Sequence, residues 1–318
     1  MTTVFLFPGQ SSASPDMLTR ARRVHPAAGD IAIRAERVLG ADLCARYCGD
    51  GGVTLETNHD VQVSMFLATQ MYLHALLAEG VHAPASLGLS LGEYSHLVHI
   101  GALDFDDALA LVHARGACYD RAPQGVMVTV LGVDRATVHE AVAQARGRGC
   151  AVVSNYNAAT QHVIAGDDGA VAWAAAWLED EHGAHTTVIE RRVPMHSPLM
   201  AGVADAFTPA LARAPWRTPA LAYLPNVSAC PVPAARPDDF VTHLAAHVSA
   251  PVRWDASVDL AAAIHPDALF VEVGPGAVLH NMLGRGWKAL RRARVDAPDG
   301  VDPRDHFAAL VEAVHAAG

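Results

Sequence analysis

The sequence predicts an α/β protein that consists of a large domain and a smaller insert. Residues 85–98 run as a short apolar strand, a turn of small residues and a helix, which is the local pattern of α/β domains. Between 126 and 190 the expected elements follow the order β-α-β-β-α-β, which is the signature of a ferredoxin-like unit. A chain of 318 residues, 51% of them hydrophobic, is long and apolar enough to build both parts.

The large domain is expected to begin with a buried strand and a long helix. Val4–Phe7 is a run of apolar residues that Pro8-Gly9 ends, so it predicts a strand. Apolar residues recur at helical spacing from Gln62 to about Leu77, which predicts an amphipathic helix. The next expected elements are a strand at Ala85–Leu89, a helix at Gly92–Val98 and a helix that Asp104 or Asp106 caps.

The insert is expected to contain four strands and two helices. The strands are expected at Val126–Leu131, Ala151–Ser154, His162–Ala165 and Thr186–Ile189. Asp134 caps the first helix, and Ala170–Leu178 forms the second. We therefore place the ferredoxin-like subdomain at 126–190 and the large domain at 1–125 and 191–295.

After the insert the large domain resumes and the chain ends in a helix. Its recognisable pieces are Val252–Trp254, Leu269–Val273 and the turn Gly274-Pro275-Gly276. Asp296–Pro303 is polar and contains proline and glycine, which is typical of a linker. Phe307, Leu310, Val311 and Val314 then predict a final amphipathic helix, so 296–318 is expected to be a linker and a C-terminal helix.

Composition excludes several classes of function. The chain has 23 Lys and Arg against 33 Asp and Glu, a net charge of −10, which argues against nucleic-acid binding. The N-terminus lacks the basic region of a signal peptide, and no apolar run approaches the ~18 residues of a membrane span. The five cysteines lack the paired spacing of zinc sites, and we expect buried free thiols even at Cys44 and Cys48. We expect a monomeric, cytoplasmic protein without a metal.

The pentapeptide Gly88-Leu89-Ser90-Leu91-Gly92 is the first candidate for chemistry. Small residues two before and two after a serine allow a sharp turn that presents its Oγ at the end of a strand. The serine would also lie at a helix N-terminus, whose free N–H groups can stabilise an oxyanion. This nucleophile elbow makes the large domain α/β-hydrolase-like; the alternative is a plain strand-to-helix turn.

A nucleophilic serine requires a base, and 18 histidines leave the choice open. His96 and His99 form an H-x-x-H pair, but the sequence offers no third ligand beside them, so a zinc site is not expected there. His196 lies between prolines in a loop directly after the insert, where a side chain can face an interdomain cleft. Arg115 is either a surface ion pair or, because its neighbours are apolar, a buried cation that requires a partner.

An ordered set of motifs resembles the malonyl-CoA:acyl-carrier-protein acyltransferase family, which includes free enzymes and domains of fatty-acid and polyketide synthases. The set spans residues 4 to about 285 and comprises Phe7-Pro8-Gly9-Gln10, Gln62, Gly88–Tyr94, Arg115-Gly116, Asn155-Tyr156-Asn157, Val193–Met200, Asn226-Val227-Ser228, Pro251–Trp254 and Glu272–Gly276. The resemblance implies a discrete acyltransferase of fatty-acid or trans-acyltransferase polyketide synthesis.

The resemblance also implies a role for each matching residue. Ser90 would be the nucleophile and His196 its base, oriented by the main-chain carbonyl of His247. The main-chain N–H groups of Gln10 and Leu91 would form the oxyanion hole. The remaining residues would bind the acyl group: Arg115 would bind its carboxylate, and Gln62, Leu89 and Met195 would line its pocket.

This chain departs from the family at four places. Leu89 stands where histidine is usual, which leaves the acyl selectivity open. Ser11 replaces a glycine, which restricts the backbone near the oxyanion hole unless φ is negative. Met195 stands where phenylalanine or serine is usual, and its flexible side chain neither admits nor excludes a 2-methyl branch. His96 and His99 replace small or apolar residues, and we expect them to be partly exposed.

The resemblance implies ping-pong transfer of a malonyl or related carboxyacyl group from coenzyme A to the phosphopantetheine thiol of an acyl carrier protein. No bound cofactor is implied, since the coenzyme A thioester is the substrate. The alternatives are a proofreading hydrolase of acyl-carrier-protein thioesters, a generic serine esterase and an inactive docking module. Both substrates are anionic, so local cations must promote docking; the candidates are Arg191, Arg192 and the group Arg285, Lys288, Arg291, Arg292 and Arg294.

Overall fold

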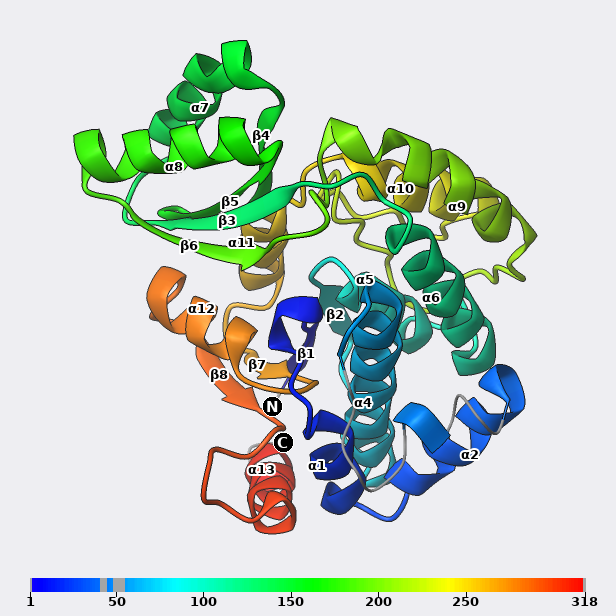
Figure 1. The fold of residues 1–318 in the computed structure, drawn as a ribbon. Coiled ribbons are helices and arrows are strands. Elements are labelled where there is room, and N and C mark those ends of the chain that lie inside the picture. The colour runs from blue at the N-terminus through cyan, green and yellow to red at the C-terminus, as the bar shows by residue number, and fades with distance from the viewer. Residues whose placement is uncertain (1, 41–44, 48–54, 317–318) are drawn as a thin grey trace.

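The computed structural model describes residues 2–40, 45–47 and 55–316, which form two sheets in two parts of the molecule (Figure 1). The larger part has four parallel strands in the order β2–β1–β7–β8. Their bounds are Thr3–Phe7 (β1), Ala85–Gly88 (β2), Leu269–Glu272 (β7) and Arg291–Arg294 (β8). Because the strands are parallel, the carboxyl ends of β1, β2 and β7 meet at one edge, which is where α/β sheets bind ligands.

The first three strands confirm the sequence prediction to within one residue, but β8 was not predicted. Its sequence Arg-Arg-Ala-Arg has no apolar run. The strand forms because its backbone pairs with β7 at the edge of the sheet, where its side chains reach solvent. Arg291, Arg292 and Arg294 of the candidate docking group therefore lie on an edge strand.

Helix α4 (Asn58–Ala78) is the central helix of the larger part. The sequence predicted an amphipathic helix here, and this was wrong in one respect: α4 is buried around most of its circumference. It packs against α1, α2, α5 and α6, so polar positions such as Gln62 and Gln70 are also enclosed. By length and composition α4 could span a membrane, but 78% of its most apolar 18-residue window is buried in the protein, as in a core helix.

The remaining helices of the larger part surround this sheet and α4. Asp104, one of the two caps expected, occupies the N-cap position of α6, but its side chain makes no capping hydrogen bond. The helices are α1 (Met17–Val24), α2 (Ala28–Leu39), α5 (Gly92–His99), α6 (Phe105–Tyr119), α9 (Ala201–Arg213), α10 (Pro237–Ser249), α11 (Trp254–Ile264), α12 (Val278–Gly286) and α13 (Pro303–Ala316). Short 3₁₀ turns lie at Gln10–Ser12 (η1) and Pro198–Met200 (η3) in the larger part, and at Ala145–Arg148 (η2) in the insert.

The second sheet is antiparallel and has the strand order β4–β5–β3–β6, which is the ferredoxin-like order. Its elements are β3 (Val126–Leu131), α7 (Arg135–Gln144), β4 (Ala151–Ala158), β5 (Gln161–Gly166), α8 (Asp168–His182) and β6 (His185–Glu190). This unit has its own core, which includes Val130, Ile164 and Leu178. The domain boundaries given above stay predictions.

The two parts are joined by backbone as well as by side chains. Val252 forms a parallel bridge with Asn155, and Trp254 begins α11. The segment 252–254 is thus a single bridge followed by a helix. The bridge holds the open face of the ferredoxin-like sheet close to the carboxyl ends of the parallel strands.

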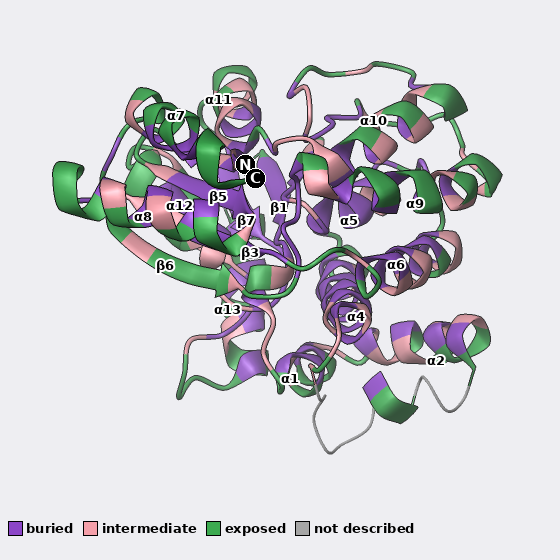
Figure 2. Ribbon diagram, turned by 45° about the horizontal axis from the view of Figure 1, so that its top comes forward, coloured by how far each residue is buried: buried purple, intermediate pink, exposed green. Residues whose placement is uncertain are grey.

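Burial follows this layered arrangement (Figure 2). The strands β1, β2 and β7 and the helix α4 are mostly buried, whereas β6, β8 and the outer face of α8 are exposed or partly exposed. The expected linker at 296–303 needs one correction. Asp296 is buried and accepts hydrogen bonds from Tyr72 Oη at 2.7 Å, Arg20 at 2.9 Å and the Gly276 N–H at 2.8 Å. The first residue of this segment therefore belongs to the packed interior.

The cysteines fit the prediction of buried thiols only in part. Cys118 is a buried free thiol, Cys150 is intermediate and Cys230 is exposed. Cys44 and Cys48 lie outside the described residues. No group of three or more His, Cys, Asp or Glu side chains that could hold a metal ion occurs within 2–40, 45–47 and 55–316.

Candidate active site

Ser90 lies on the turn between β2 and α5, at the carboxyl edge of the parallel sheet. Its φ is +51°, a left-handed conformation that is unusual for serine and marks a strained turn. The flanking glycines allow the turn: a Cβ on Gly88 would lie 2.2 Å from the Gly92 carbonyl oxygen, and one on Gly92 would lie 2.1 Å from the Phe7 oxygen. The backbone geometry is that of the elbow expected from the sequence.

Asn226 holds this turn from the other side. Its Nδ2 donates to the Gly88 carbonyl at 2.6 Å, and its Oδ1 accepts from the Ser90 N–H at 2.8 Å. One buried amide thus satisfies the backbone on both sides of Leu89. The sequence places Asn226 in a motif but predicts no role for it, because the residue lies far from Ser90 along the chain.

His196 is the histidine that meets Ser90. Its Nε2 lies 2.8 Å from Ser90 Oγ, and its Nδ1 donates to the main-chain carbonyl of His247 at 2.7 Å. The second bond leaves Nε2 unprotonated in the neutral ring, so Nε2 can take a proton from Ser90. His196 also has a positive φ, of +59°, which turns the loop after β6 toward the serine.

Burial controls the charge of His196. The side chain is enclosed, and burial, the neighbouring His247 and then Arg115 lower its pKa well below the usual range, against the opposing effect of the bond to the His247 carbonyl. The imidazole is therefore neutral at physiological pH, which is the state that a general base requires.

Two main-chain N–H groups lie beside this pair. Gln10 follows the end of β1, and Leu91 follows Ser90 directly, so both belong to the edge where Phe7 and Gly88 are paired. Among the described residues no acceptor is recorded for either N–H. Ser11 lies in the turn η1 and is not among the residues with positive φ, so serine is accommodated in place of glycine.

Arg115 projects from α6 into the interior and is 1% exposed. Its guanidinium donates to Gln62 Oε1 at 2.7 Å and to Tyr119 Oη at 2.8 Å, and it lies 4.1 Å from the centre of the Tyr119 ring. Within the described residues no carboxylate pairs with it. The alternative in which Arg115 forms a surface ion pair is therefore wrong.

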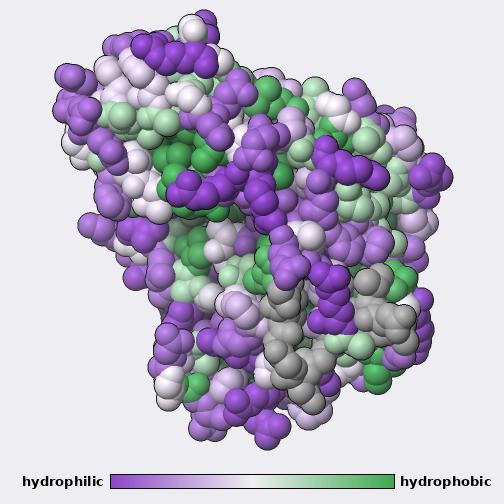
Figure 3. All heavy atoms as spheres, in the orientation of Figure 1, coloured by the Kyte–Doolittle hydropathy of each residue, from purple (hydrophilic) through white to green (hydrophobic). Residues whose placement is uncertain are grey.

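A cavity of about 390 Å³ opens onto Ser90 and His196 between the two sheets. Its walls are mainly apolar and come from both parts of the molecule. They include Gln10, Leu89 and Met195 from the larger part and Met127, Asn157 and Ile189 from the insert. Figure 3 shows apolar side chains gathered along this junction.

Arg115 and Gln62 do not line the cavity but lie behind Gln10. Gln62 Nε2 donates to Gln10 Oε1 at 3.5 Å, which connects the buried guanidinium to the cavity wall. The structure therefore brings together Ser90, His196, His247 and the two N–H groups. Arg115 lies farther from the cavity, behind Gln62.

One of the two expectations for histidines needs correction. His96 is fully buried, not partly exposed, whereas His99 does keep partial exposure. Both rings contact Ser86 Oγ, at 2.7 and 2.9 Å, and His96 also accepts from the Leu224 N–H. Burial lowers the pKa of His96 to about 3 and that of His99 to about 4, so they are neutral core residues.

Glu93 and Tyr223 were not identified from the sequence. Glu93 is fully buried in the first turn of α5, with Oε1 accepting from Tyr223 Oη at 2.5 Å and Oε2 lying 3.0 Å from His247 Nδ1. The only available signal was an acidic residue directly after an elbow at a helix N-terminus, where negative charge is favourable.

Comparison with known proteins agrees with this geometry. The sequence pattern of the family described as acyl transferase domain matches residues 4–309. The malonyl CoA-acyl carrier protein transacylase of Escherichia coli K12 is 31% identical over 302 residues, covering 93% of this chain and 96% of that protein. Its counterpart in Haemophilus influenzae is 32% identical over 289 residues, covering 88% and 90%.

Solved structures are similar over almost the whole chain. The malonyl-CoA:acyl carrier protein transacylase of Xanthomonas oryzae has a TM-score of 0.87 at 30% identity and covers 98% of this chain and 99% of that one. A malonyl-transacylase in complex with a type II polyketide synthase acyl-carrier protein has a TM-score of 0.88 at 25% identity, covering 98% and 100%.

Proposed function

The chain belongs to the acyl transferase domain family, and we propose that it transfers a malonyl group from coenzyme A to the phosphopantetheine thiol of an acyl carrier protein. The relatives named malonyl CoA-acyl carrier protein transacylase support malonyl as the acyl group. The similar transacylase that was solved with its carrier protein supports the acceptor.

The reaction proceeds in two half-reactions through an acyl-serine. His196 Nε2 takes the Ser90 proton as Oγ attacks the thioester carbonyl of malonyl-CoA, and the N–H groups of Gln10 and Leu91 stabilise the tetrahedral oxyanion. The intermediate collapses and coenzyme A leaves as a thiol with the proton from His196. The carrier thiol then attacks malonyl-Ser90 while His196 again removes and returns a proton, which regenerates the serine.

The observation that carries the proposal is the buried Arg115. A guanidinium taken out of water without a carboxylate is costly, and its hydrogen bonds to Gln62 and Tyr119 are to neutral groups. The free carboxylate of a malonyl group supplies the missing anion through two parallel hydrogen bonds. Gln62, which already binds Arg115 and contacts Gln10, would move aside or share this carboxylate.

Leu89 and Met195 complete the acyl pocket in this proposal. Both line the cavity beside Ser90 and neither carries a charge, so they contact the methylene group next to the thioester rather than the carboxylate. The substrate is a coenzyme A thioester and the reaction needs no further cofactor or metal. A monomeric state and a cytoplasmic location remain parts of the proposal.

Carrier docking would use cations at the mouth of the cavity. Arg191 and Arg192 are exposed and directly follow Ile189 and Glu190, which line the cavity. Arg285 is exposed on α12 and donates at 3.0 Å to Oε1 of Gln161, a residue of the insert that lines the cavity. Lys288 follows α12, and Arg291, Arg292 and Arg294 belong to β8. Local positive charge of this kind attracts an acidic carrier despite the net charge of −10.

Intact-mass measurement after incubation with malonyl-CoA tests the function. We expect a malonyl adduct on the wild type, none on Ser90→Ala, and transfer of the adduct to a phosphopantetheinylated carrier protein. Thr129→Ala, which changes another residue of the cavity wall, serves as the matched control and should still load.

The hydrolase alternative makes the opposite prediction. It gains no support from relatives named as transacylases. If the wild type released free malonate from malonyl carriers without passing the group to a fresh carrier, the transferase proposal would be wrong.

A further inference from the structure

Four residues form a closed ring of contacts around the serine–histidine pair. Ser90 Oγ meets His196 Nε2, and His196 Nδ1 donates to the carbonyl of His247. The His247 side chain then turns back, placing Nδ1 3.0 Å from Glu93 Oε2. The Glu93 N–H donates to the Ser90 carbonyl at 3.0 Å and closes the ring. His247 thus contacts His196 through its backbone carbonyl and, separately, contacts Glu93 through its imidazole.

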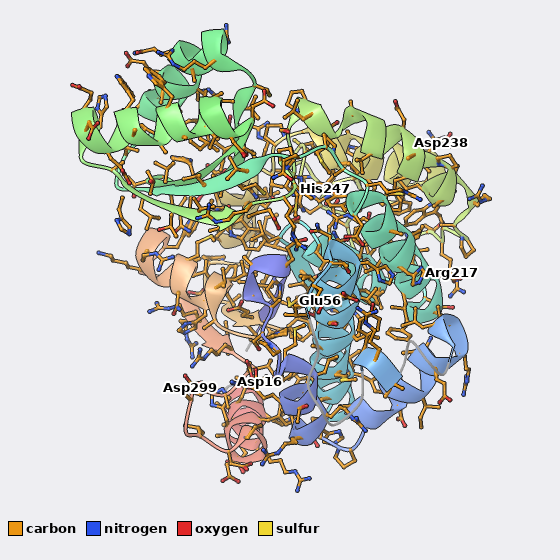
Figure 4. All side chains as sticks on the ribbon, in the orientation of Figure 1. Asp16, Glu56, Arg217, Asp238, His247 and Asp299 are labelled. Carbon is orange, nitrogen blue, oxygen red and sulfur yellow. The ribbon has the colours of Figure 1, made fainter. Side chains whose placement is uncertain are left out.

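His247 and Glu93 lie at helix ends that favour opposite charges. His247 occupies the last turn of α10, where free carbonyl groups favour a cation, and Glu93 occupies the first turn of α5, where free N–H groups favour an anion. Figure 4 shows His247 in the middle of the molecule, whereas Asp238, near the other end of α10, lies at the periphery. His247 is 2% exposed and Glu93 is 0% exposed.

A carboxylate buried this completely is stable as an anion only with a cationic partner. Tyr223 Oη donates one hydrogen bond to it, and His247 is the one cation-forming side chain recorded within ion-pair distance of Glu93 among the described residues. Glu93 and the His247 ring therefore form a buried pair, in which Oε2 and Nδ1 lie 3.0 Å apart while His247 Nε2 has no hydrogen-bond partner among the described residues. The rings of His247 and His196 are stacked, with centroids 4.8 Å apart and planes 15° apart, so the His247 ring covers one face of the catalytic imidazole.

The groups that face these two rings are few. The His196 ring contacts Ser90 of the elbow and His247 of α10. Arg115 of α6 acts on it electrostatically. His247 faces Glu93 from α5, and Tyr223 and His243 lie beyond that carboxylate. Arg115 and His247 both oppose a positive charge on His196, and Glu93 lies on the far side of His247.

We propose that His247 is a positioning residue that acts through its side chain: its contact with Glu93 fixes the carbonyl that orients His196, and its stacked ring shields the His196 imidazole from water. The inference builds on the proposed function, because it assigns His196 as the base. The carbonyl alone would be supplied by any residue at 247, whereas the contact with Glu93 and the stacked ring require the histidine side chain.

His247→Gln tests the proposal because it keeps the carbonyl and removes the ring. The probe is a fluorophosphonate that labels the nucleophilic serine, with rates measured from pH 4.5 to 8.5. We expect the midpoint of the acid limb to rise by about one pH unit in His247→Gln, so that labelling below both midpoints is about tenfold slower. The rate above pH 8 should stay within about threefold of the wild type.

Glu93→Gln should shift the limb in the same direction, because the His247 ring then loses the carboxylate that holds it against His196. The double variant should shift no further than His247→Gln alone, since both changes remove one interaction. His243→Gln is the matched control: it lies one turn earlier on α10 and contacts the Tyr223 ring, and it should leave the limb in place. Should His247→Gln fail to fold, Glu93→Gln alone decides the question.

An unmoved limb in either variant, or a loss of rate by the same factor at every pH, would overturn the proposal. Additive shifts in the double variant would also overturn it. Fluorophosphonate labelling does not require malonyl-CoA. A wild type that is labelled but never malonylated would therefore refute the proposed function and leave this test of His247 intact.

Discussion

The Arg115 guanidinium and the Gln62 side-chain oxygen are hydrogen-bonded at 2.7 Å inside the protein, on the far side of Gln10 from the cavity. The same guanidinium contributes to the low pKa of His196. Arg115 is therefore close enough to the catalytic pair to act on it electrostatically, yet it is held by neutral partners that an incoming carboxylate can replace.

Arg115→Lys should reduce kcat/KM for malonyl-CoA about 10- to 100-fold, because lysine keeps the charge but loses the planar two-pronged donor set. Arg115→Ala should reduce it further. Loading of acetyl-CoA, which has no free carboxylate, should change much less. Arg121→Ala, an exposed arginine nearby, is the control. Equal losses for malonyl and acetyl groups would show that Arg115 does not select the carboxylate.

Gly92→Ala should abolish labelling of Ser90 and destabilise the protein by more than about 3 kcal/mol. The new Cβ would lie 2.1 Å from the Phe7 oxygen, so either β1 or the start of α5 must shift. Gly29→Ala is the matched control, since a Cβ there meets nothing within 4 Å and should stabilise α2 by up to about 1 kcal/mol. Urea unfolding checks both values. A fully reactive Gly92→Ala protein would contradict this account of the elbow.

The parts of the site that follow local rules were predictable from the sequence. The strand–turn–helix pattern identified Ser90, and the proline-flanked loop after the insert singled out His196. The resemblance to a family then paired them. Both residues have positive φ, a local strain that sequence patterns of small residues and prolines can indicate.

The rest depends on contacts between distant segments. Asn226, Glu93 and Tyr223 are polar residues without a local motif, and their roles come from the backbone groups and side chains that the fold places beside them. The strand β8 forms from Arg-Arg-Ala-Arg because β7 offers a free edge. Periodicity also misjudged α4, whose polar positions are enclosed because helices pack on several sides of it.

Asn226→Asp should weaken the elbow without changing its volume. The carboxylate can still accept from the Ser90 N–H, but it loses the donor to the Gly88 carbonyl and places an oxygen against it. We expect a loss of about 1–3 kcal/mol in the free energy of unfolding and slower fluorophosphonate labelling. Asn281→Asp, on the exposed surface of α12, should do neither. Unchanged stability and labelling in Asn226→Asp would remove this residue from the site.

Stability should fall with decreasing pH because of the buried histidines. The pKa of His99 is about 4 in the folded protein, whereas an unfolded histidine titrates near 6.5, so the unfolded state binds more protons between these values. The free energy of unfolding is fully retained above pH 6.5. It is lost as the pH falls toward 4, by roughly 1.4 kcal/mol per pH unit for each such histidine.

His99→Phe isolates one of these contributions. Phenylalanine suits the site, where the His99 ring lies 5.2 Å from the Phe5 ring and 6.0 Å from the Phe7 ring, and Ser86 keeps its bond to His96. Between pH 6 and 5, the fall in the free energy of unfolding should be smaller by up to about 1.4 kcal/mol in the variant than in the wild type. Replacing the exposed His182 by Gln should leave the slope unchanged. Urea unfolding at each pH measures the slopes, and equal slopes in His99→Phe and the wild type would mean that His99 is free to take up a proton in the folded protein.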